Sequence, residues 1–173
     1  VLIAATAFFV ASEFALLASD RKYFESESTK GFRSSKTVLL LLKNLSYHLT
    51  GAQLGITITA VILGFIAEPT IAELLHSPMD YVVGASASDT ISLVLAIIIV
   101  TLLTMIVGEL IPKNIAIAKP NQAAKVLSRP FQIYSFLAKP LIYVSDQVSI
   151  RLTRAFGVEP AEELLHTPNI DDL

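Results

Sequence analysis

A glutamate followed by a proline stands at the end of a long uncharged stretch of this chain. Glu109 and Pro112 lie in the sequence Gly-Glu-Leu-Ile-Pro-Lys at 108–113, and residues 91–107 before it carry no charge. A carboxylate at the end of a membrane-spanning helix is costly and needs a physical reason. Pro112 lacks an amide hydrogen, so carbonyl groups in the turn before it lose their usual donor. Carboxylate and carbonyl oxygens around Gly108 and Glu109 would suit a hard cation.

A second acid lies in the first apolar segment. Glu13 follows Ser12, so a helix there would carry a hydroxyl and a carboxylate toward the same half of the membrane as Glu109. Oxygen atoms from two helices at one depth predict a cation site. Two alternatives remain open. Glu13 alone fits an ion pair with Lys113 or another base equally well, and Ser12 alone fits a hydrogen bond to a carbonyl one turn back.

The second apolar segment adds neutral oxygen atoms. Thr50, Gln53 and Thr57 follow helical spacing, so the Gln53 amide could bind a cation while the threonines line a path. Gly51 and Gly55 also favour close helix packing, and Gln53 would then form a hydrogen bond across that helix or dimer interface. Both readings of this segment stay open at the level of sequence.

All candidate ligands offer an oxygen atom, the ligand atom that hard cations prefer. Asn114 completes the set, because its amide lies just beyond Pro112 and could cap free backbone groups or bind the ion. The candidate metal ligands are Ser12, Glu13, Gln53, Gly108, Glu109 and Asn114. Three scattered histidines and the lack of cysteine argue against zinc, and no phosphate-binding loop or Gly-x-Ser-x-Gly motif indicates an enzyme.

The composition indicates an integral membrane domain. Of 173 residues, 53% are hydrophobic and 16% are charged, and the mean hydropathy is +0.63, which is too apolar for an ordinary soluble domain of this size. The formal net charge of -2 and the scattered basic residues do not favour nucleic acid as a partner. The lipid bilayer is therefore the expected surrounding.

Three apolar segments are long enough to predict transmembrane helices. They cover residues 1–18, 49–67 and 91–111. Residues 68–90 carry Asp and Glu but no Lys or Arg. All 13 Lys and Arg residues lie either between the first and second segments or after the third segment. The positive-inside rule then predicts an external loop at 68–90, an external N-terminus and a cytoplasmic C-terminus.

The region after the third segment is expected to stay at the inner membrane surface. Pro120, Pro130 and Pro140 divide it into pieces of about ten residues, which are too short to span a membrane. Residues 141–156 place apolar side chains on one face, which predicts an amphipathic helix. The predicted all-α chain comprises a three-helix transmembrane domain (1–118), a cytoplasmic juxtamembrane helical belt (119–157) and the start of a linker to a cytoplasmic module (158–173).

Three motifs carry a family resemblance that covers nearly the whole chain. They are Ala-Ser-Glu-Phe-Ala-Leu at 11–16, Gln-Leu-Gly-Ile-Thr at 53–57 and, most specifically, Gly-Glu-x-x-Pro-Lys at 108–113. With them, the chain resembles the transmembrane domain of the cyclin-M and CorC family of magnesium transporters, whose bacterial members are often labelled hemolysin C-like. The resemblance implies three transmembrane helices, a juxtamembrane belt, a homodimer formed through the membrane helices, and CBS modules beyond this chain.

For the site, the resemblance implies a dehydrated Mg²⁺ in an inward-facing cavity. Carried over by position, it points to Ser12, Glu109 and the carbonyls of 108–114, beside a broken third helix. Many members have serine or asparagine at three positions where this chain does not: Val10, Ile56 and Ala60.

The function that the resemblance implies is divalent-cation transport in the cell (inner) membrane. Mg²⁺ would move outward with the energy of a Na⁺ gradient. The alternative, from another class, is a non-transporting dimeric anchor or sensor that presents cytoplasmic regulatory modules. A polar cavity open to water would favour the transporter, and a dry packed interface would favour the anchor.

Overall fold

The computed structural model describes residues 1–156, without the side chains of Val83 and residues 85–87. Within this part every regular element is a helix, which confirms the predicted all-α membrane class. The predicted linker at 158–173 lies outside the described residues. The helices are α1 (Leu2–Ala18), α2 (Arg21–Thr29), α3 (Arg33–Lys43), α4 (Leu45–Val83), α5 (Ala85–Leu103), the π-helical turn η1 (Thr104–Leu110), α6 (Ile111–Ala118), α7 (Pro120–Leu137) and α8 (Lys139–Ala155).

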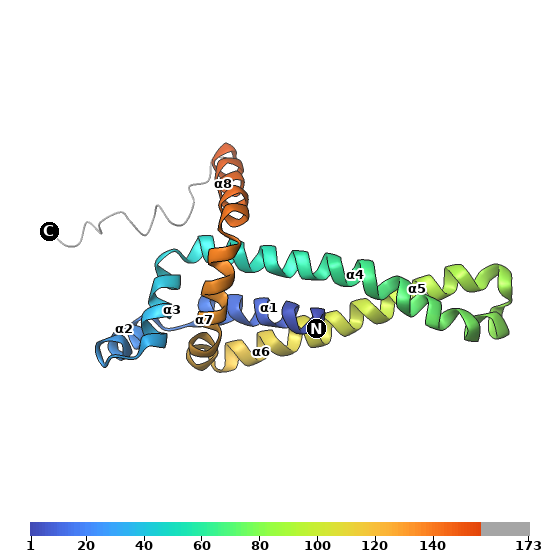
Figure 1. Cartoon of the computed structure of the whole chain (residues 1–173), viewed down its shortest axis with the longest axis horizontal. Coiled ribbons are helices and arrows are strands. Elements are labelled where there is room, and N and C mark those ends of the chain that lie inside the picture. Colours follow the sequence, from blue (N-terminus) through green and yellow to red (C-terminus); the bar gives the residue numbers. More distant parts are fainter. Residues whose placement is uncertain (157–173) are drawn as a thin grey trace.

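Two long helices and α1 form the membrane-spanning part. The stretches Leu45–Val82 and Ser88–Ala118 are long and apolar enough to cross a membrane, and α1 provides a third span if it is counted with α2, which follows it at an angle of 88°. Figure 1 shows α4 and α5 as a long antiparallel pair, with α1 beside α4 and α6. All three predicted apolar segments therefore lie in helices of this bundle.

The stretch expected to be an external loop is instead the helical tip of the α4–α5 hairpin. α4 continues through Pro69 and Pro78 as far as Val83, and α5 begins at Ala85. Gly84 alone makes the turn, with a φ of 80° that favours glycine. The loop prediction was wrong because the packing of α4 against α5 offsets the local cost of each internal proline, about 3 kcal/mol.

A histidine joins the two helices at this tip. His76 Nε2 lies 2.7 Å from Oδ1 of Asp89 in α5, and its Nδ1 lies 3.3 Å from Oδ2 of Asp80 in α4. A protonated imidazole donates from both nitrogens and can therefore bridge both carboxylates. These two acids have a structural partner, as expected for a helical hairpin rather than an open loop.

Pro112 does not break the third membrane helix. The helix widens into η1 just before the proline and then continues as α6. Pro112 lies in the first turn of α6, where a missing amide hydrogen costs least. The expectation of a broken helix was wrong, because a π-helical turn takes up the disturbance without ending the helix. Gly108 and Glu109 lie in this turn, and such turns are frequent at functional sites.

Helices α2, α3, α7 and α8, called the belt below, lie at the end of the bundle away from the hairpin tip (Figure 1). Pro120 and Pro140 lie in the first turns of α7 and α8, but Pro130 lies inside α7, so the expectation of three short pieces was wrong there. Packing of α7 against α1 and α3 holds the helix together across Pro130. α8 confirms the predicted amphipathic helix, with Ile142 buried and its neighbour Tyr143 exposed.

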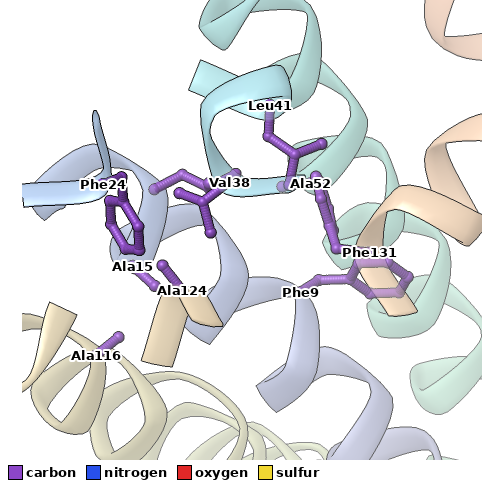
Figure 2. Close-up of a cluster of buried hydrophobic side chains, with 10 residues drawn as sticks. Phe9, Ala15, Phe24, Val38, Leu41, Ala52, Ala116, Ala124 and Phe131 are labelled. Carbon is purple, nitrogen blue, oxygen red and sulfur yellow. The ribbon is translucent and has the colours of Figure 1, made fainter. Parts of the chain in front are cut away.

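The hydrophobic core joins the belt to α1 and α4. Phe24 of α2 and Phe131 of α7 are fully buried, and Phe9 of α1 is 8% exposed. Figure 2 shows these rings gathered with Val38 and Leu41 of α3. Burying one such side chain contributes roughly 1.5–3 kcal/mol, so the belt is held to the membrane helices by packing.

Two glycines of α4 allow close helix contacts. A Cβ atom added at Gly55 would lie 2.6 Å from the Phe9 ring of α1, closer than carbon atoms can approach. A Cβ added at Gly51 would lie 2.9 Å from the end of Ile142 in α8. The packing interpretation of both glycines is confirmed, and both contacts lie within this chain.

The substitution Gly55→Ala is expected to lower the free energy of unfolding by about 1–3 kcal/mol, because the added methyl group must displace Phe9 or α1. Thermal unfolding in detergent measures the effect. Gly64→Ala is the matched control on the same helix, since its added Cβ meets only the flexible end of Glu68, at 3.3 Å. Equal destabilisation by both substitutions would contradict the prediction.

A charged cluster joins α7 to α2. Lys125 Nζ donates hydrogen bonds to Glu27 Oε2 at 2.9 Å and to the Tyr23 hydroxyl at 2.8 Å, and Lys30 donates to Glu27 Oε1 at 3.2 Å. The hydrogen bonds from Lys125 and Lys30 hold the pKa of Glu27 below its ordinary value. The stability from this cluster is therefore fully present above the ordinary carboxyl pKa and is lost as the pH falls through the lowered pKa.

The substitution Lys125→Met is expected to flatten the acid limb of the stability profile. Without Lys125, the pKa of Glu27 rises toward its ordinary value, so less stability is left to lose on acidification. Unfolding midpoints in detergent between about pH 7 and about pH 3 would show this. Lys119→Met, at an exposed position, is the control and should keep the wild-type slope.

Candidate cation-binding site

The structure distributes the predicted ligands over separate hollows. Glu13 and Gln53 share one cleft, Glu109 lines a second, and Ser12 lines a narrow crevice. Asn114 is exposed on α6. The candidate ligands lie on α1, α4, η1 and α6, and the folded chain does not bring all of them to one point.

The first hollow, the Glu13 cleft, has a volume of about 470 Å³ and lies between α1, α4 and α8. Its half-buried acid, Glu13, makes no hydrogen bond and no ion pair with any residue in the described part of the chain. The charge of Lys113 acts on Glu13, but its Nζ lies over the Phe14 ring at 4.6 Å. The suggested direct ion pair is thus not formed. The lining residues are Glu13, Leu49, Thr50, Gln53, Leu54, Thr57, Ser145 and Ser149.

The second hollow, the Glu109 cleft, has a volume of about 350 Å³ and lies between α4, α5 and η1. It contains a second carboxylate, Glu68, which sequence reasoning assigned to an external loop. The helical spacing of Ala60, Gly64 and Glu68 could have revealed it, because these residues share one face of α4. The lining residues are Ala60, Leu63, Gly64, Glu68, Val100, Thr101, Thr104, Met105 and Glu109.

The two clefts follow one another along one side of α4. Gln53 and Thr57 line the Glu13 cleft, and Ala60 and Gly64 line the Glu109 cleft. Steps of three and four residues keep these positions on one helical face. This face of α4 therefore carries polar side chains at Gln53 and Thr57 and small residues at Ala60 and Gly64, with an acid near each end.

Buried hydroxyls lie where α1 crosses α4 and η1. The Thr6 and Thr59 hydroxyls are 3.0 Å apart and hydrogen-bonded, and Thr6 is fully buried. Gly108 is buried. A Cβ atom added at Gly108 would lie 3.5 Å from the Thr104 side chain and 3.6 Å from the Thr6 side chain. Thr104 Oγ1 is buried without a hydrogen-bond partner among the described residues. Sequence reasoning missed Thr6 and Thr104, whose only signal was a hydroxyl within an apolar helix.

Ser12 makes the hydrogen bond to a carbonyl one turn back, which the sequence left open as an alternative to ion binding. Its Oγ donates a hydrogen bond to the Phe8 carbonyl at 2.7 Å, and its side chain is almost fully buried. The crevice beside it, lined also by Ser128 and Phe131, has no room for a water molecule. Ser12 must rotate and the surrounding helices must separate before its hydroxyl can reach an ion.

The donor chemistry of both clefts matches a hard cation that keeps part of its water. Among the described residues, no group of three or more His, Asp or Glu side chains has an arrangement that could hold a metal ion by itself. Magnesium is commonly held by one or two carboxylates while retaining several waters. One carboxylate in the Glu13 cleft and two in the Glu109 cleft are within this range.

Helices of spanning length around carboxylate-bearing clefts define an all-α integral membrane domain. The chain belongs to the family described as the cyclin M transmembrane N-terminal domain, whose family model matches residues 1–170. This confirms the family resemblance of the three sequence motifs. The description of the family as a transmembrane domain agrees with the helices of spanning length in this structure.

Curated bacterial relatives share this domain. The UPF0053 protein MT1890 of Mycobacterium tuberculosis is 39% identical over 165 residues, which cover 94% of this chain and 36% of that protein. From Bacillus subtilis, the UPF0053 protein YhdP is 37% identical and YhdT is 36% identical; each match covers 94% of this chain, with 37% of YhdP and 36% of YhdT. The chain thus spans little more than a third of these relatives.

Proposed function

We propose that this domain exports magnesium across the cell membrane, with Na⁺ entry as the source of energy. The observation that carries the proposal is the position of Glu109 on the π-helical turn η1, where it lines a cleft with a second carboxylate, Glu68. Membership of a transporter-type family supports the same class of function. Magnesium is the expected cargo because the charged groups of the cleft, Glu68 and Glu109, offer carboxylate oxygen atoms, the ligands that hard cations prefer.

In this proposal Glu109 supplies negative charge to a partly dehydrated ion. The carbonyls of η1 near Gly108 supply further oxygen atoms, because a π-helical turn interrupts the regular hydrogen-bond ladder. Ser12 and Asn114 would join only after a movement of α1 against η1, since Ser12 now donates its hydrogen bond to Phe8. An inward-facing cavity that contains Ser12 and Glu109 is thus a second conformation, reached by movement at the deformable turn.

The assembly and orientation are also proposals. The basic residues of the belt support a cytoplasmic position for the belt and an external position for the hairpin tip. Exposed apolar side chains of α4, among them Val61 and Phe65, suit contact with lipid and with a second copy in a homodimer. CBS modules would follow in the remainder of the full-length protein.

Flux through the reconstituted full-length protein tests this function. Liposomes containing the protein and an internal magnesium dye would be followed with and without a Na⁺ gradient, beside protein-free liposomes. The proposal expects protein-dependent Mg²⁺ movement that is accelerated when Na⁺ runs in the opposite direction. Mg²⁺ movement that ignores Na⁺ would remove the coupling ion from the proposal.

A non-transporting anchor or sensor is the competing function. The separation of Ser12 from Glu109 into different hollows is the observation that favours it. In an anchor these residues serve helix packing and need no water-filled cavity. Absence of flux from folded, dimeric full-length protein would decide for the anchor.

A further inference from the structure

The belt helix α8 forms one wall of the Glu13 cleft. Ser145 and Ser149 are one helical turn apart and line the cleft opposite residues of α1 and α4. Neither serine hydroxyl has a hydrogen-bond partner among the described residues. With the Glu13 carboxylate and the Gln53 amide, four unpartnered polar side chains from three helices therefore converge on one hollow.

The wall is fixed in place by contacts on the buried face of α8. Asp146, only 7% exposed, accepts a hydrogen bond from the Thr50 hydroxyl at 3.1 Å. Ile142 is fully buried and lies against Gly51 of α4. These contacts lie on either side of Ser145 along the helix, so they set the position of its hydroxyl relative to α4.

The size of the cleft decides what form of cation it could hold. A magnesium ion with six waters occupies on the order of 200 Å³, taking about 30 Å³ for each water. The volume of the Glu13 cleft, about 470 Å³, exceeds the volume of such a hydrated ion. One carboxylate with neutral hydroxyl and amide groups suits outer-sphere contacts, in which bound waters donate hydrogen bonds to protein oxygens.

We infer that the Glu13 cleft is a loading site for hydrated Mg²⁺, in which Ser145 and Ser149 of α8 bind the water shell and Glu13 supplies the charge. The inference rests on the proposed function and extends it to a second site. The ion would meet α4 here first and lose water only farther along this helix, at Glu109. α8 is thereby part of the ion path and not only a scaffold.

Protection of an engineered cysteine tests the site without measuring transport. This chain has no cysteine, so Ser149→Cys or Ser145→Cys would be the reactive group once any cysteine elsewhere in the full-length protein is replaced. The protein in nanodiscs would be treated with a water-soluble maleimide at constant ionic strength, with and without MgCl₂. Gln147→Cys, on α8 but not lining the cleft, is the matched control.

At a Mg²⁺ concentration about ten times the dissociation constant, modification of Ser149→Cys should slow by about 10-fold, because only the empty fraction reacts. Adding Glu13→Gln should abolish this protection, and Gln147→Cys should react at one rate throughout. Lack of protection at both serine positions, protection that persists in Glu13→Gln, or equal protection of Gln147→Cys would overturn the site.

The two proposals can fail separately. Protected cysteines in a protein without Mg²⁺ flux would retain the loading site and reject the transport function. Flux through a protein whose cysteines are never protected would retain transport and reject the loading site.

Discussion

Replacing Glu109 with glutamine is expected to reduce Mg²⁺ flux through the full-length protein at least about 100-fold. Glu109 is exposed in this structure, but in the proposed inward-facing conformation it would pair with a partly dehydrated ion, and removing one charge from such a pair costs about 3–5 kcal/mol. Glutamine keeps the size of the side chain and one carbonyl oxygen but cannot neutralise a divalent cation. The effect should be large because Glu109 lies on the π-helical turn, where the ion would be least hydrated. Dye-reported flux in liposomes measures it.

The matched control for Glu109→Gln is Glu73→Gln. Glu73 is an exposed acid near the hairpin tip, so the same chemical change there should leave the flux at the wild-type level. Thermal unfolding without Mg²⁺ should be alike for both variants, which separates ion binding from folding. Undiminished flux in Glu109→Gln would remove Glu109 from the ligands and shift the argument to the Glu13 cleft.

The substitution Phe131→Ala is expected to lower the free energy of unfolding by about 3–5 kcal/mol, because it empties a fully buried position in the belt. The ring lies among those of Phe8, Tyr134 and His48, with centroid distances of 5.9–6.5 Å. Its loss therefore loosens α7 from both α1 and α4. For a domain of this size the unfolding midpoint should fall on the order of 10 °C.

The same helix provides the control for this prediction. Phe136 is 76% exposed, so Phe136→Ala removes an equal side chain without opening a cavity. Its unfolding midpoint in detergent should stay within a few degrees of wild type. A Phe131→Ala variant as stable as Phe136→Ala would mean that the belt is not held to the membrane helices by this core.

The fold was largely predictable because the length of an apolar segment can be read directly from the sequence. An uncharged run long enough to cross a bilayer must be a helix, since lipid offers no partner for free backbone groups. The errors concern prolines. Pro69 and Pro78 fall in the stretch that was expected to be a loop, and Pro130 was expected to end a helix, yet each lies within a helix. Whether a proline ends a helix depends on the neighbour that packs there, and sequence periodicity does not contain that information.

The candidate site was predictable in kind but not in arrangement. The cost of placing Glu13 and Glu109 in apolar segments identifies both as functional candidates without any structure. Their separation does not follow from the sequence, because the rotation of each helix about its axis is set by packing. The close contact between Gly55 and Phe9 is one such constraint on α1 and α4. Helix packing also decides that Glu68 lines the Glu109 cleft and that Ser145 and Ser149 line the Glu13 cleft.

The sequence by itself determined the membrane environment, the helical class, the family motifs and the presence of acids within apolar helices. The helical class follows from the cost of exposing unpaired backbone groups to lipid, and the cost of charge in lipid makes the acids candidates for function. The tertiary structure alone decided that Pro112 continues a helix through a π-helical turn, that Ser12 faces a closed crevice, and that Glu13 faces α8. These outcomes depend on contacts between helices distant in sequence, where a single close packing contact fixes which oxygen atoms share a cleft.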